Sequence, residues 1–194
     1  ALNALTSGAY NTAIGYQAGL LMQDCSSNTI MGYQAFKAAD SGEANNVVIG
    51  KGAGSAINSN GSDSNVIIGA SAGIGGAGAM ASCVAIGTNA QYCSSDCSSN
   101  TTVGACAMYF NTSGPENTAV GRDSLKTSVS GSQNTALGAY SQLVSIASYN
   151  TSVGFATLKC NTTGQNKTAI GYCALTCNTH GARGTAVGSS AMKC

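Results

Sequence analysis

The chain has 194 residues, only 8% of them charged, and a formal net charge of +1 at neutral pH. It has no basic stripe, which argues against a nucleic-acid partner. No apolar run approaches the roughly 20 residues that a membrane helix needs, so we expect no membrane insertion. Glycine does not recur at every third residue, which excludes collagen.

A glycine returns every 16 to 19 residues along the whole chain, within a repeated text of the form NTAIGYQAG. A fixed period of this length indicates stacked structural units rather than one globular core. We therefore treat residues 1–194 as a single repeat domain. In chain order, the repeat glycines are Gly15, Gly32, Gly50, Gly69, Gly87, Gly104, Gly121, Gly138, Gly154, Gly171 and Gly188.

Each repeat glycine, taken as position zero, follows a short strand pattern. Position −1 is always aliphatic or Met, and position −3 is always Thr or Val. β-branched residues favour strands, and alternate residues share one face, so we predict that positions −3 and −1 face inward. Position +3, always Ala, Ser or Thr, is predicted to form a second inward column. The predicted fold is all-β: a parallel β-solenoid of about eleven coils, each of 16–19 residues, roughly 50 Å long.

Position −2 and the glycine are then predicted to form an outward stripe of small residues. Small residues let a second backbone approach closely, which makes this stripe a candidate assembly face. A bend or bulge is the plainer role for the glycine, and both roles stay open. The predicted assembly face comprises Ala13, Gly15, Ala85, Gly87, Ala119, Gly121, Ala136, Gly138, Ala169, Gly171, Ala186 and Gly188.

Position −4 is Asn in eight of the coils. In stacked coils these side chains would lie about 4.8 Å apart, close enough for a hydrogen-bonded ladder. Capping of local backbone groups in a turn is the alternative. Both roles are structural and neither needs a ligand.

Nine cysteines indicate an oxidising compartment and a set of disulfide bonds. Two pairs share one 13-residue spacing and the same positions in neighbouring coils, and two further pairs are plausible partners. Cys25 is left over, as a free thiol or a bond to another chain. Two Cys-x3-Cys spacings are tolerable for zinc, but with one histidine and no CxxC we predict no metal site. The predicted bonds are Cys93–Cys106, Cys160–Cys173, Cys177–Cys194 and Cys83–Cys97.

The chain offers no recognisable catalytic constellation. Its seven acidic residues are scattered and form neither a carboxylate pair nor a calcium loop, so we expect no enzyme activity and no cofactor. Six Asn-x-Ser/Thr sequons occur, of which Asn60, Asn111 and Asn161 fall in predicted turns. These three are the candidate glycosylation sites.

The repeat text itself resembles known surface proteins. The segment LKCNTTGQNKTAIGYCAL at residues 158–175 is similar to repeats of bacterial and phage tail-fibre-like proteins. It also resembles the Ala/Gly-rich head repeats of trimeric autotransporter adhesins. The resemblance implies a left-handed parallel β-roll, often with three chains side by side, that works as a fibre or adhesin outside the cell. The nine cysteines are a departure from those repeats.

We therefore expect an extracellular or virion-surface fibre protein that assembles with itself. Association is expected side by side through the Ala/Gly stripe, or head to tail, because residues 191–194 align in register with residues 1–4 and solenoid ends are open strand edges. The alternative is a surface-binding module. Either the Thr column would order water or ice, although it is predicted to face inward, or Tyr16, Tyr33 and Tyr172 would bind a glycan on a host surface.

Overall fold

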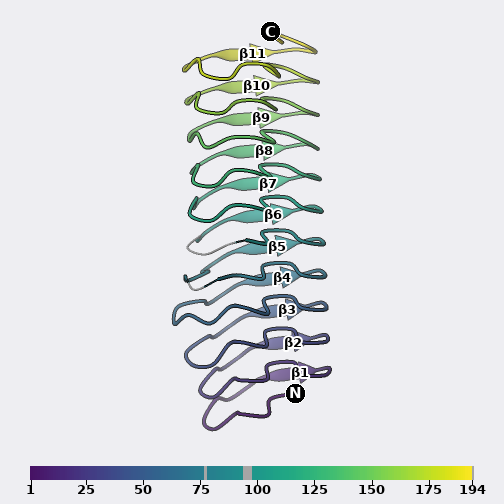
Figure 1. Cartoon of the computed structure of the whole chain (residues 1–194), viewed down its shortest axis with the longest axis vertical. Helices are drawn as coiled ribbons and strands as arrows, with labels where there is room; N and C mark the ends of the chain where they lie inside the picture. The colour runs from purple at the N-terminus through teal and green to yellow at the C-terminus, as the bar shows by residue number, and fades with distance from the viewer. Residues whose placement is uncertain (77, 94–97, 194) are drawn as a thin grey trace.

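The computed structural model describes residues 1–76, 78–93 and 98–193. Within these residues eleven three-residue strands stack in chain order into one parallel sheet, which forms a long rod (Figure 1). Each strand pairs with the one 16 to 19 residues further along, so the predicted parallel β-solenoid is confirmed. The described part of the chain contains no helix long and apolar enough to cross a bilayer. The strands are β1 (Thr12–Ile14), β2 (Thr29–Met31), β3 (Val47–Ile49), β4 (Val66–Ile68), β5 (Val84–Ile86), β6 (Thr101–Val103), β7 (Thr118–Val120), β8 (Thr135–Leu137), β9 (Thr151–Val153), β10 (Thr168–Ile170) and β11 (Thr185–Val187).

The repeat glycine ends each strand at the closest approach between two coils. Gly50 has a φ of +138°, and a Cβ there would lie 2.4 Å from the carbonyl oxygen of Gly69. Both the backbone conformation and the space therefore require glycine. The backbone that approaches the glycine belongs to the next coil of the same chain, not to a second chain.

The predicted orientation of the strands is wrong. The middle residue of each strand, at position −2, points into the coil: Ala119 has no exposed surface, whereas Val120 beside it is 37% exposed. Positions −3 and −1 therefore face outward, and the Ala/Gly stripe is not an outward assembly face. The alanines of that stripe are buried except in the first coil, where Ala13 is half-buried. The residues of the rejected face are Ala13, Gly15, Ala85, Gly87, Ala119, Gly121, Ala136, Gly138, Ala169, Gly171, Ala186 and Gly188.

The interior is thin, and side-chain volumes across it compensate one another. Ala119 at position −2 shares its coil with Leu125 at position +4, whereas Val48 shares its coil with Gly54. A Cβ at Gly54 would lie 3.2 Å from Phe36 and 3.4 Å from Val48, so that glycine makes room for larger neighbours. The predicted inward column at position +3 is confirmed. Its buried members are Ala18, Ala35, Ala53, Ala72, Ala90, Ala107, Ser124, Ser141, Thr157 and Ala174.

The asparagines at position −4 form a ladder and also cap the turns. The Oδ1 atom of Asn117 accepts bonds from the backbone N–H of Asn134 at 2.9 Å and from its Nδ2 at 3.1 Å. The Nδ2 of Asn117 donates to the carbonyl oxygens of Gly114 and Gly131 at 3.0 and 2.8 Å. Both alternatives left open by the sequence are therefore present, and the ladder fixes each turn to the next coil.

Candidate binding face of the solenoid

The outward side of the sheet carries two columns of uncharged side chains, which we call the Thr/aliphatic face. Position −3 supplies Thr or Val and position −1 supplies an aliphatic residue or Met from every strand. The face comprises Thr12, Ile14, Thr29, Met31, Val47, Ile49, Val66, Ile68, Val84, Ile86, Thr101, Val103, Thr118, Val120, Thr135, Leu137, Thr151, Val153, Thr168, Ile170, Thr185 and Val187.

Strand pairing makes this face regular. From β6 to β11, six threonines stand in register on successive strands, each beside an aliphatic residue. Parallel strands repeat every 4.7–4.9 Å, so the side chains form straight columns along the rod. From β3 to β5, valine replaces threonine and the face becomes wholly aliphatic. Such a surface suits either a flat apolar partner or an ordered layer of water.

The aliphatic side chains of the face remain accessible in the single chain. Ile14, Met31, Val120, Ile170 and Val187 are all among the exposed large hydrophobic residues. Eleven strands of two outward residues each give a strip of roughly 50 by 7 Å, on the order of 350 Å². Apolar patches of this size on soluble proteins mark interaction sites.

Aromatic residues at position +1 lie where the chain leaves the strands. Tyr16 stacks on Tyr33 with ring centroids 5.4 Å apart, and Phe155 stacks on Tyr172 at 5.5 Å. The predicted tyrosine stripe is thus present as two separate stacks. Ala70 and Ala105 interrupt it between them.

The cysteines do not form the predicted bonds. Cys93, Cys106, Cys160 and Cys173 are free thiols, so the Cys93–Cys106 and Cys160–Cys173 disulfides are not formed. Positions +2 and +6 stack as separate columns: the N–H of Cys106 donates to Thr88 and that of Cys93 to Tyr109. In the two remaining predicted pairs, Cys83 is buried and Cys177 is exposed. Their predicted partners, Cys97 and Cys194, lie outside the described residues.

Cys25 is buried and not placed to bond another chain. Its Sγ donates to Oε2 of Glu43 at 3.1 Å, and neither side chain has exposed surface. Burial and the adjacent Glu43 carboxyl raise the pKa of Cys25 to about 12. Burial also raises the pKa of Glu43, whose Oε1 has no hydrogen-bond partner. This pair is a structural thiol and a buried acid, not an intersubunit bridge.

The raised pKa of Glu43 predicts that stability falls as pH rises. The buried neutral acid contributes stability below the unfolded-state pKa of about 4.3, and this contribution is lost as pH rises through the folded-state value. Glu43→Gln should flatten the loss between about pH 4 and pH 8, because an amide stays neutral. Thermal unfolding midpoints across this range measure the effect. Glu116→Gln, at an exposed side chain, is the control, and an equally flattened profile for it would refute the assignment.

Two of the three candidate glycosylation sites are buried. The Nδ2 of Asn111 donates to the carbonyl oxygen of Gly114 at 2.8 Å, and Asn161 bonds Gly164 in the same way at 2.8 Å. Both side chains lack exposed surface, so neither can accept a glycan in the folded protein. Asn60 is exposed and remains a candidate.

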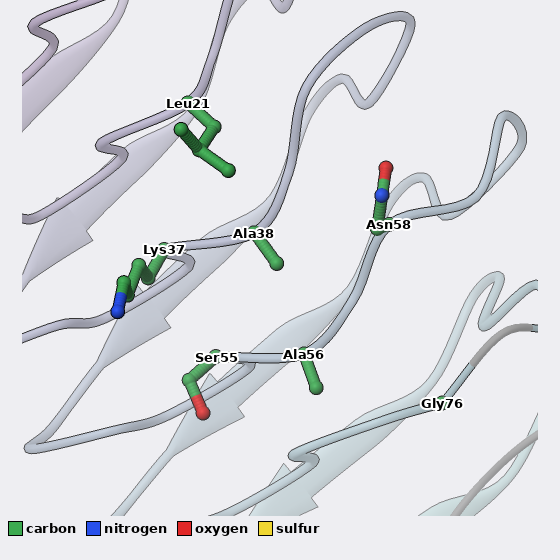
Figure 2. Close-up of a pocket in the computed structure, with 7 residues that line it drawn as sticks. All are labelled: Leu21, Lys37, Ala38, Ser55, Ala56, Asn58 and Gly76. Atoms are coloured by element: carbon green, nitrogen blue, oxygen red, sulfur yellow. The ribbon is translucent and has the colours of Figure 1, made fainter.

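A surface hollow of about 530 Å³ lies away from the sheet (Figure 2). It forms because alanines, Ala38 and Ala56, stand at position +6 where other coils carry larger residues such as Phe110. Lys37 is its one ionisable residue, so the hollow offers little chemistry. Nowhere in residues 1–76, 78–93 and 98–193 do three His, Cys, Asp or Glu side chains gather as metal ligands.

The chain matches no family model, no curated protein and no solved structure. The functional argument therefore depends on the geometry of the chain itself. Of its surfaces, the Thr/aliphatic face is the longest and most regular.

Proposed function

We propose that this protein is a structural fibre protein of the cell or virion exterior whose chains associate side by side through the Thr/aliphatic face. One observation carries the proposal: two uncharged outward columns run in register over all eleven described strands. The assembly face thus replaces the Ala/Gly stripe that the sequence predicted. The role is mechanical rather than catalytic.

The size of the face makes association energetically reasonable. Two strips of about 350 Å² that cover each other bury roughly 700 Å², which contributes on the order of 17 kcal/mol. Association costs about 4–15 kcal/mol, so the apolar contact alone offsets that cost. The trimer implied by the resemblance would turn three such faces toward one axis.

A charge placed on the face should separate the chains. Val120→Asp puts a carboxylate in the middle of the −1 column, where burial against another chain would desolvate it. We expect the wild type to run at about three times the 19.1-kDa chain mass, and Val120→Asp to run as a monomer. Size-exclusion chromatography with light scattering measures both.

Val129→Asp is the matched control, since Val129 is an exposed valine in a turn. It should leave the mass unchanged. A monomeric wild type, or equal effects of the two substitutions, would contradict association through this face. Electron microscopy of the same samples separates discrete rods from the end-to-end filaments that the sequence predicts.

Ice binding is the second candidate, because the threonine column faces outward rather than inward. Six in-register threonines beside aliphatic residues form a flat, regular array on which water can order. Thermal hysteresis of the wild type and of Thr135→Tyr tests this candidate. A monomer with hysteresis that the substitution abolishes favours ice binding, and an oligomer without hysteresis favours the fibre.

A further inference from the structure

A second surface lies beside the Thr/aliphatic face, in the turns that follow β7 to β10. It joins basic and aromatic side chains from four successive coils, and we call it the aromatic–basic edge. Its members are Arg122, Lys126, Tyr140, Phe155, Lys159 and Tyr172.

The side chains of this edge form a continuous row along the rod. The Arg122 guanidinium lies 4.8 Å from the centroid of the Tyr140 ring, and the Lys159 ammonium lies 5.8 Å from it. Phe155 meets the same ring edge-on at 5.6 Å and stacks on Tyr172 at 5.5 Å. Cation–π contacts of this kind hold the cations in place while leaving their donors open to solvent.

Positive charge is concentrated at this edge. Asp123 pairs with Lys126 at 2.8 Å and with Arg122 at 3.7 Å. Among the described residues no carboxylate lies within ion-pair distance of Lys159. Three cations against one carboxylate leave two net positive charges here, more than the +1 carried by the whole chain.

We propose that the aromatic–basic edge binds an anionic polysaccharide laid along the rod axis. Arg122 and Lys159 would contact carboxylate or sulfate groups, with Arg122 able to do so through two parallel bonds. The exposed rings of Phe155 and Tyr172 would pack against sugar faces. Lys126 and Lys159 occupy the same position two coils apart, about 10 Å, a separation that one disaccharide spans.

A polysaccharide fits this edge better than a nucleic acid. Nucleic-acid binding depends on many phosphate contacts from Lys and Arg. Here the cations are few, widely spaced and interleaved with rings, which suits a polymer with one charge per disaccharide. The inference does not depend on the fibre role, because the edge lies outside the Thr/aliphatic face.

Calorimetric titration of the full chain with heparin, hyaluronan and neutral dextran tests the proposal. Heparin carries sulfates and hyaluronan only carboxylates, so these two arms identify the anionic group. We expect at least one of them to bind and dextran to fail. Arg122→Ala and Tyr140→Leu should each weaken binding about tenfold.

Arg183→Ala, which removes one exposed cation from a turn of another coil, is the matched control. It should leave the affinity unchanged, and circular dichroism should show all three variants folded. No binding of either anionic polymer overturns the proposal. So does equal binding of dextran, equal weakening by Arg183→Ala, or tighter binding of single-stranded DNA of the same length.

Discussion

Gly121→Ala is expected to lower the free energy of unfolding by about 3–5 kcal/mol. The φ of Gly121 is +128°, a conformation that alanine adopts only with strain. An added Cβ would also lie 2.6 Å from the carbonyl carbon of Gly138, which is backbone and cannot move aside. Urea unfolding followed by circular dichroism measures the loss.

Gly184→Ala is the control for this substitution. Gly184 lies in a turn, and a Cβ there would meet no atom within 4 Å. Its replacement should change stability by about 0.5 kcal/mol or less. Similar losses at Gly121 and Gly184 would mean that coil contact is not what requires the repeat glycine.

Asn117→Ala should lower the free energy of unfolding by about 3–5 kcal/mol. The substitution removes the acceptor for the Asn134 N–H and the donor to Gly131, and all of these groups are buried. Unpaired buried polar groups cost about 1–3 kcal/mol each. Urea unfolding gives the total, and faster hydrogen exchange at the Asn134 amide locates it.

Two further variants separate the ladder from a general effect of losing asparagine. Asn117→Asp keeps the acceptor but loses the donor, so its loss should be intermediate at low pH. Asn60→Ala, at an exposed turn residue, should change stability by about 0.5 kcal/mol or less. An unchanged amide exchange rate at Asn134 in Asn117→Ala would contradict the ladder.

The coil period, the strand positions and the pairing register all follow from the sequence, because each repeats identically in every coil. The glycine and asparagine columns could be predicted for the same reason. The direction in which each strand faces could not. The most apolar columns, exemplified by Ile170 and Val120, lie outside, and a rule that places apolar residues inside fails here.

A subtler signal does carry the orientation. Position −2 is large where position +4 is glycine, as with Val48 and Gly54, and small where position +4 is large, as with Ala119 and Leu125. Such compensation is expected only between side chains that share one interior. Residues at −3 and −1 show no such relation, which is consistent with their outward position.

The candidate sites failed for a different reason. A sequon in a turn normally indicates exposure, but Asn111 and Asn161 turn inward to bind the glycines three residues later. Cysteine spacing along the chain likewise says little about distance around the coil. Both errors arise because a solenoid turn is stabilised by its own polar side chains.

The hydrogen bonds between coils run along the axis of the rod, from β1 at one end to β11 at the other (Figure 1). A force applied between the two ends therefore acts on these bonds in line, one coil after another. The rod should then lengthen in steps, each releasing about 17 residues, or roughly 60 Å of extended chain. A fibre of such chains would behave under tension as a molecular shock absorber, in which lateral contacts between neighbours decide the force at which the first coil opens.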